Sequence, residues 1–141
     1  MREILFRGKS NYGNVGEWEY GLVSQPHVIE NGIVTSYYFT KLCEDGHSSR
    51  RTVSANTIGQ YTGLTDKNGK KIFDVDIVKI YLCEPNGLAN YEIGYIKNDD
   101  AKARYVFCTE EGIYGIDNSN VFEVIGNIHD NPELLKGGEQ G

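Results

Sequence analysis

The sequence predicts an all-β protein. Turn signals in which Asn, Asp or Glu precedes Gly recur along the chain, and each suits a tight turn between strands. The segments between these turns either alternate apolar and polar residues or are rich in β-branched and aromatic residues, and both patterns are typical of strands. Only the last residues have a helical pattern. These observations favour a small SH3-like barrel or a β-sandwich, with an additional N-terminal β-hairpin lobe and a short C-terminal helix.

The chain of 141 residues is long enough to bury an apolar core without disulfides, and its 39% hydrophobic and 24% charged residues suit a globular protein. We expect a single domain over residues 1–141. Within it, the pattern predicts an N-terminal β lobe at about 1–55, a barrel-like core at about 56–128 and a C-terminal helical tail at 129–141.

The N-terminal part is predicted to contain strands joined by polar loops. Alternating or β-branched residues predict its strands, which are expected at residues 2–7, 18–23 and 33–40. The Asn31-Gly32 pair predicts the turn before the last of these strands. Polar composition predicts loops at residues 10–16 and 44–51.

Residues 58–82 form the most regular local pattern and predict a β-hairpin. Two strand-like runs flank residues 66–69, where Asn68-Gly69 tolerates the positive φ that a hairpin turn requires. In the second run, Val78 and Ile80 fall on one face of a single strand and Ile77 on the other.

The remaining elements follow from the same signals. Turns are expected at Asn86-Gly87 and Glu111-Gly112. The strand-like or apolar runs between and after them lie at residues 91–97, 104–109, 113–116 and 121–125. Asn131 suits a helix N-cap and Pro132 the first helical position, so a short helix is expected after them.

The charge balance argues against a protein that binds nucleic acid through bulk positive charge. Acidic residues outnumber Lys and Arg by 20 to 14, the net charge is −6 and the pI is about 5.0. A local basic patch near the central hairpin stays an alternative, with Arg50-Arg51 and three lysines clustered in sequence, namely Lys67, Lys70 and Lys71. Tyr37, Tyr38 and Phe39 would then be a base-stacking platform, although a packed strand explains them better.

The cysteines and the apolar segments predict a cytoplasmic location. Three cysteines, Cys43, Cys83 and Cys108, are widely spaced, which favours reduced thiols over a disulfide framework. The first residues lack the apolar stretch of a secretory signal. No segment approaches the ~18 apolar residues of a membrane span, so no membrane partner is expected.

None of the motifs that resemble functional sites predicts a catalytic, cofactor or metal site. Gly8-Lys9-Ser10 lacks the first glycine and the helix of a phosphate-binding loop. A turn explains Asp66, Asn68 and Gly69 better than a calcium loop does. Asp74 and Asp76 would share one side of an extended chain and could be an acid/base or metal pair, but capping of backbone amides explains them better.

The histidines and hydroxyl side chains add no catalytic pattern. They lack ligand spacing or an adjacent base, and they comprise His27, His47, His129, Ser54, Thr57 and Thr62. We therefore expect a protein that is not an enzyme.

Several blocks in order resemble the YopX family of phage and prophage proteins. They are residues 2–7 (REILFR), 57–64 (TIGQYTGL), 66–73 (DKNGKKIF), 76–78 (DIV), 123–128 (EVIGNI) and 131–135 (NPELL). The family has a glycine before the aspartate of the DIV block, where this chain has Val75, so the bend that glycine permits is absent or is made by another residue. The resemblance implies a β-rich fold with a small barrel, a phage or prophage origin and self-association, and it implies no activity.

We therefore expect a phage- or prophage-encoded intracellular protein that acts as a non-catalytic, homo-oligomeric binding protein. Its partners would be further copies of itself and a host or phage protein. The alternative is a nucleic-acid-associated module that uses the basic patch near the central hairpin. A hydrolase that uses Asp74 and Asp76 is the weakest hypothesis.

Overall fold

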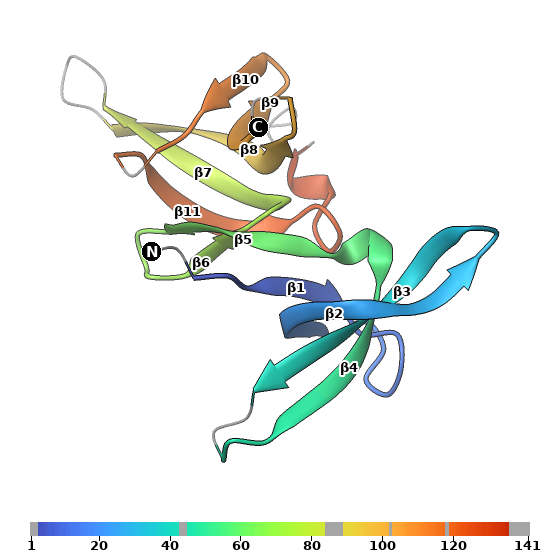
Figure 1. Ribbon diagram of the computed structural model, residues 1–141. Helices are drawn as coiled ribbons and strands as arrows, with labels where there is room; N and C mark the ends of the chain where they lie inside the picture. The colour runs from blue at the N-terminus through green and yellow to red at the C-terminus, as the bar shows by residue number, and fades with distance from the viewer. Residues whose placement is uncertain (1–2, 43–44, 84–88, 102, 118, 136–141) are drawn as a thin grey trace. The chain divides into compact units, whose positions relative to one another are not determined.

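The computed structural model describes residues 3–42, 45–83, 89–101, 103–117 and 119–135. Within these ranges the chain forms eleven β-strands in two antiparallel sheets, so the all-β prediction is confirmed (Figure 1). The sheets do not close into a barrel, which corrects the barrel expected from the pattern and from the family resemblance. Among the described residues, no helix is both long and apolar enough to cross a membrane.

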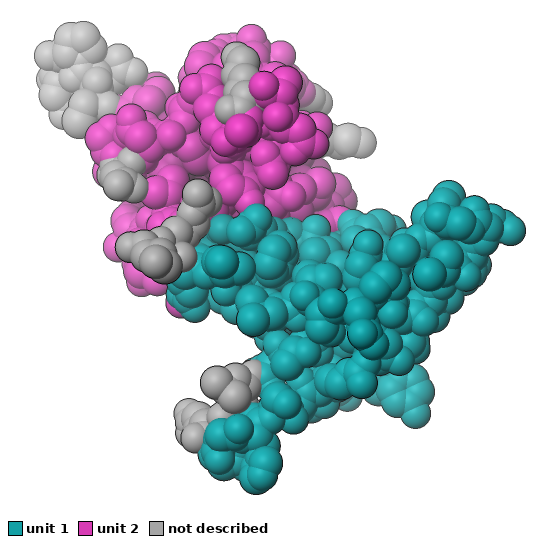
Figure 2. Space-filling model, in the orientation of Figure 1, with its two compact units in different colours: residues 1–61 teal, residues 62–141 magenta. Residues whose placement is uncertain are grey.

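The chain divides into two compact units, Met1–Tyr61 and Thr62–Gly141, which are called unit 1 and unit 2 and are described separately (Figure 2). Strand β5 (Gly59–Thr65) contains the boundary. Its first residues pair with unit 1, because Gln60 lies opposite Phe6 and Gly59 opposite Arg7.

Unit 1 is an antiparallel sheet with the strand order β4-β3-β2-β1-β5. Its other strands are β1 (Phe6–Lys9), β2 (Trp18–Glu30), β3 (Ile33–Leu42) and β4 (Ser48–Ser54). The predicted turn between β2 and β3 is confirmed, since Asn31 and Gly32 have φ of 53° and 79°. Phe39 and Val53 are buried in the core of this unit.

The polar segment 44–51 is not a loop throughout, because its last residues begin β4. This strand contains seven residues, and Val53 is its only apolar one. An edge strand with solvent on much of both faces has no need of alternating apolar residues. The sequence therefore lacked the signal on which strand prediction depends.

Unit 2 contains a five-stranded antiparallel sheet with the order β10-β9-β8-β7-β11. Its strands are β7 (Asp76–Cys83), β8 (Ala89–Asp99), β9 (Arg104–Thr109), β10 (Gly112–Gly115) and β11 (Val121–Asn127). Strand β6 (Lys71–Phe73) lies next to β5. The buried core consists of Ile72, Val78, Ile80, Ile96, Phe107 and Phe122.

The run that follows the central turn is two strands and not one. The turn itself is confirmed, with Gly69 at φ 81°. Val75 then separates β6 from β7 and has φ 63°, a left-handed conformation that β-branched residues rarely adopt. Its N–H donates to the Ile96 carbonyl (2.7 Å) and its carbonyl accepts from the Ile128 N–H (3.1 Å). Valine itself therefore makes the bend for which the family has glycine.

The C-terminal part follows the prediction where it is described. Residues 133–135 are helical, and the Leu134 N–H donates to the Asn131 carbonyl (3.0 Å), so the short C-terminal helix is confirmed. The turn predicted at Asn86-Gly87 lies outside the described residues.

Candidate interaction surfaces

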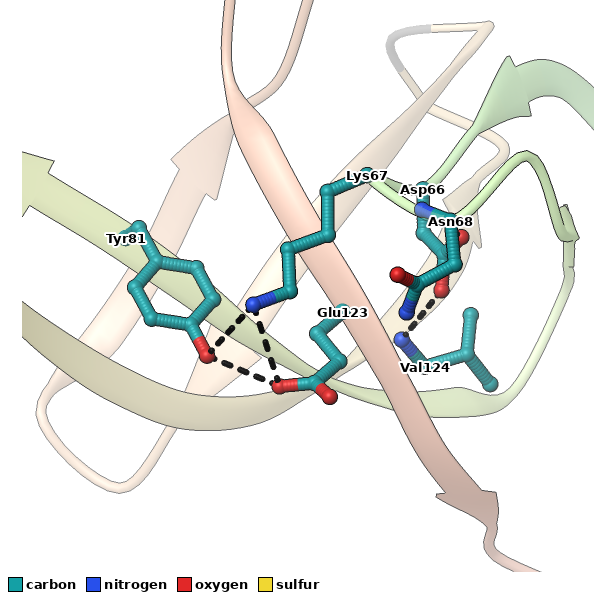
Figure 3. A network of polar contacts seen from close by, with 6 residues as sticks. All are labelled: Asp66, Lys67, Asn68, Tyr81, Glu123 and Val124. Carbon is teal, nitrogen blue, oxygen red and sulfur yellow. Dashed lines mark hydrogen bonds and ion pairs between the residues drawn. The ribbon is translucent and has the colours of Figure 1, made fainter.

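The Asp66 carboxylate is occupied by backbone amides (Figure 3). One oxygen, Oδ1, accepts from the N–H groups of Asn68 (2.8 Å) and Lys70 (2.9 Å), and Oδ2 accepts from the Val124 N–H of β11 (3.0 Å). Burial alone would raise the pKa of Asp66, but these hydrogen bonds and the Lys70 charge outweigh it and lower the pKa. The geometry supports the turn that was predicted here and not a calcium loop.

The neighbouring Lys67 ties the same turn to β11. Its backbone N–H donates to the Phe122 carbonyl (2.9 Å). Its ammonium lies 4.6 Å from the centre of the Tyr81 ring, and the Tyr81 hydroxyl donates to Glu123 Oε1 (2.8 Å), as Figure 3 shows. The turn therefore covers the outer edge of β11 with both backbone and side-chain contacts.

Asp74 and Asp76 do not act as one extended pair. Asp76 is 1% exposed, and its Oδ2 accepts from the Phe73 N–H (2.8 Å). Asp74 Oδ1 accepts from the Asn98 N–H across the sheet (3.1 Å). The left-handed backbone at Val75 removes the extended geometry on which their shared side depended. Each carboxylate satisfies a backbone amide, which is the capping role considered from the sequence.

The hydroxyl side chains singled out in the sequence also bind backbone groups. Thr57 Oγ1 donates to the Ser54 carbonyl (2.7 Å) and accepts from the Lys9 N–H (2.8 Å). Thr62 Oγ1 donates to the Ile72 carbonyl (2.8 Å). These contacts hold chain connections in place.

The histidines are distributed over separate places. His27 lies in β2, His47 contacts Asp45, and the His129 N–H donates to Asn127 Oδ1. Over the described residues, no group of three His, Cys, Asp or Glu side chains could hold a metal ion. Cys108 is a buried free thiol. Cys43 and the Cys83 side chain lie outside the described part of the chain.

Unit 2 contains a hollow of about 240 Å³. It is lined by Gly63, Leu64, Thr65, Asp117, Asn120 and Phe122. The Ser119 hydroxyl and N–H hydrogen-bond to Asp117 and lower its pKa. The Asn120 side chain accepts from the Asp117 N–H (2.9 Å). The two polar side chains therefore stabilise their own turn.

One face of the unit 1 sheet combines aromatic rings with cations, and we call it the cationic–aromatic face. In β1, Arg7 and Lys9 alternate with Gly8, and both contact the Trp18 ring of β2, at 4.5 Å and 5.3 Å from its centre. Tyr20 lies opposite Arg7 in the same pair of strands. Residues opposite each other in an antiparallel pair share a face, so Arg7, Lys9, Trp18 and Tyr20 form one surface.

The same face continues onto β3 and β4. Arg50 lies 4.0 Å from the centre of the Tyr38 ring, and the ring of His27 lies 4.6 Å from it. The row Leu22, Thr40, Arg50 links this half of the face to the first half through register. Leu22 is 49% exposed and Tyr20 is 42% exposed. Large apolar side chains thus stand in solvent beside the cations.

Carboxylates lie on the opposite face of this sheet. Glu19 pairs with Arg51 (3.6 Å), and both residues alternate with members of the cationic–aromatic face. Arg50 and Arg51 therefore serve different faces although they are adjacent. Of the residues in the predicted basic patch, the two arginines face apart within unit 1, and the three lysines belong to unit 2.

The tyrosine run is also divided between the two faces. Phe39 is buried in the core, whereas Tyr38 belongs to the cationic–aromatic face. The contacts of Arg7 and Lys9 with Trp18 were not predicted from the sequence. The i, i+2 spacing of Arg7 and Lys9 places them on one face, but only the register between β1 and β2 brings Trp18 to them.

One comparison with known proteins identifies the family, and another supports the fold. A family model described as YopX protein matches residues 6–136. A search of curated proteins gave no match. The crystal structure of protein EF1440 from Enterococcus faecalis is similar, with a TM-score of 0.56, 23% identity and coverage of 96% of this chain and 99% of that chain. At this identity the similarity shows the fold alone.

Proposed function

The chain belongs to the YopX family, and on this basis we propose that it is a non-catalytic binding protein that associates with further copies of itself. The observation that carries the proposal is the exposed edge of β10 in unit 2. An edge strand presents unpaired backbone donors and acceptors, and proteins usually protect such strands with charge, proline or a covering segment.

The longer edge strands β4 and β11 have such protection. The Asp66–Lys67 turn covers the outer edge of β11. Strand β4 contains Arg50 and Arg51, and the Asn11 N–H donates to its Thr52 carbonyl (3.2 Å). Both arrangements discourage a further strand from pairing there.

Strand β10 has none of these devices within the part of the chain that the structure describes. Its sequence is Gly-Ile-Tyr-Gly, without charge or proline, and it pairs with β9 alone. Ile113 is 65% exposed and Tyr114 is 45% exposed. An uncharged edge with exposed apolar side chains favours addition of another strand.

A second copy of the same strand fits this edge. In a two-fold antiparallel pairing centred on Ile113, Tyr114 of each copy would lie opposite Gly112 of the other. The large ring would then meet a residue without a side chain, which leaves room for it. Such a contact is isologous and closes after two copies.

The non-catalytic role, the cytoplasmic location and the phage origin in this proposal have separate support. Asp66, Asp74 and Asp76 accept backbone hydrogen bonds, which is a structural use of the acids that a hydrolase would need. The buried free thiol of Cys108 suits a reducing cytoplasm. The phage or prophage origin is proposed from the family.

Light scattering after size exclusion tests the proposal with a matched pair of variants. The wild-type protein should have more than a monomer mass at micromolar concentration. Ile113→Lys should shift it to a monomer, because a charge on the edge opposes pairing. Ile33→Lys, at a residue that is 67% exposed in unit 1, should leave the mass unchanged. A monomer mass for the wild type, constant over a tenfold change in concentration, would remove self-association from the proposal.

A further inference from the structure

We propose that the cationic–aromatic face of unit 1 binds a single strand of nucleic acid. This binding site shares no residue with β10 and does not depend on self-association. It is built from Arg7, Lys9, Trp18, Tyr20, Tyr38 and Arg50.

Charge segregation is the first argument. Along β1 to β4, the residues that share this face by register include Arg7, Lys9 and Arg50 and no Asp or Glu. Glu19 lies on the opposite face with Arg51. In a protein with a net charge of −6, a face that keeps its cations and excludes carboxylates is complementary to an anion.

The aromatic side chains are the second argument, and they favour nucleic acid over an acidic peptide. Trp18 and Tyr38 hold cations by cation–π contact, which fixes charges that would otherwise be mobile. Tyr20 and Leu22 stand exposed between them along the sheet. Unpaired bases stack on such side chains. The carboxylates of an acidic peptide do not stack on aromatic rings.

The individual roles follow from burial. Arg7 is 5% exposed, so it positions Trp18 and contributes charge at a distance. Lys9 is half-buried and Arg50 exposed, so these two are the side chains that can reach phosphate oxygens. Tyr20 offers the ring for stacking.

Two other occupants fit this face less well. A second copy in a two-fold arrangement would place the same cations against one another, at an electrostatic cost. A DNA duplex keeps its bases stacked inside and presents phosphates, and two accessible cations neutralise few of them. A single strand supplies both phosphates and free base faces.

Trp18 makes the experiment direct because it is the only tryptophan of the chain. Its fluorescence is followed while a thymidine oligonucleotide of about 12 nucleotides, within the known range of site sizes, is added at low salt. We expect a saturable change in fluorescence. We also expect the affinity to fall as salt increases.

Adjacent arginines on opposite faces provide matched variants. Arg50→Ala should weaken binding about fivefold or more and reduce the salt slope by about one. Arg51→Ala removes the same charge from the other face and should leave both quantities unchanged. Tyr20→Ala should weaken binding about tenfold through lost stacking. Unfolding midpoints of the three variants show whether each is folded, and Arg50→Lys tests whether charge alone restores binding.

Several results would overturn the proposal. They are a fluorescence signal that does not change with the oligonucleotide, and equal losses for Arg50→Ala and Arg51→Ala. Saturation by polyglutamate at the same concentration would assign the face to acidic peptides instead. If duplex DNA bound with the same affinity as the single strand, the binding would come from bulk charge and not from base stacking. None of these results bears on association through β10, which light scattering measures independently.

Discussion

Val75 shows how one residue is held in a conformation that it does not prefer. A left-handed backbone costs an L-residue roughly 1–2 kcal/mol because Cβ approaches the following carbonyl oxygen. The hydrogen bonds to Ile96 and from Ile128 fix the backbone on both sides of Val75. The adjacent Asp76 accepts from Phe73 and closes the bend. The surrounding sheet thus imposes the conformation.

Substitution of Val75 should reverse the usual order of glycine and alanine. In ordinary strand positions Gly is less stable than Ala by about 0.5–1 kcal/mol. At φ 63° we expect Val75→Gly to be more stable than Val75→Ala by about 1 kcal/mol, since only glycine avoids the Cβ contact. Chemical denaturation measures the free energy of unfolding of both variants. The same two substitutions at Ile93 of β8 are the control and should keep the usual order.

Asp66 stabilises the molecule in its ionised form. Asp66→Asn replaces a carboxylate oxygen by an amide group, which cannot accept all three backbone N–H groups at once. We expect a loss of about 2 kcal/mol at pH 7. Asp100→Asn, at an exposed turn, should change stability by less than about 0.5 kcal/mol.

The difference in unfolding free energy between the wild type and Asp66→Asn should depend on pH, and its sign follows from the direction of the Asp66 pKa shift. The folded-state pKa of Asp66 lies below the ordinary value of an aspartate, so the stabilisation is complete above the unfolded-state pKa. It is lost as the pH falls through the lower, folded-state pKa. The wild-type protein should therefore lose its advantage over Asp66→Asn in acid. A difference in unfolding free energy that is constant from pH 7 to about pH 2 would contradict the assignment.

At the scale of elements, the close pairing of β8 and β9 depends on Gly94. A Cβ atom there would lie 2.3 Å from the Cys108 carbonyl oxygen and 2.8 Å from Phe107 Cζ. Because one of these atoms belongs to the backbone, we expect Gly94→Ala to cost about 2–3 kcal/mol. At Gly115 the nearest atom is 3.3 Å away on the Arg104 side chain, so Gly115→Ala should be nearly neutral. Equal unfolding midpoints for Gly94→Ala and Gly115→Ala would contradict this packing at Gly94.

The sequence predicted the strands that are rich in β-branched and aromatic residues and missed a strand that is mostly polar. Strands β3 and β9 have such a composition, so their sequences indicate strands. Strand β4 lies at an edge and has a polar sequence that resembles a loop. The break at Val75 was not predicted because the residue type favours an extended strand, and contacts from Ile96 and Ile128 override that preference.

The candidate surfaces were less predictable than the fold. Trp18, Tyr20 and Leu22 were recognisable as one side of a strand by their i, i+2 spacing. That Arg7, Lys9 and Arg50 join them depends on pairing between strands that are distant in sequence. Register of this kind leaves no local signal in the chain.

At the scale of the whole molecule, charge determines what kind of nucleic acid is excluded. Acidic residues outnumber basic ones by 20 to 14, so a long duplex meets net repulsion beyond any local contact. Affinity for arbitrary duplex DNA comes almost entirely from the counterions that are released when Lys and Arg neutralise phosphates. The cationic–aromatic face offers few such residues. We therefore expect no sub-micromolar complex with duplex DNA at physiological salt, and a gel-shift titration measures this. A salt-sensitive, sub-micromolar duplex complex would mean that the arrangement of the cations matters more than the net charge.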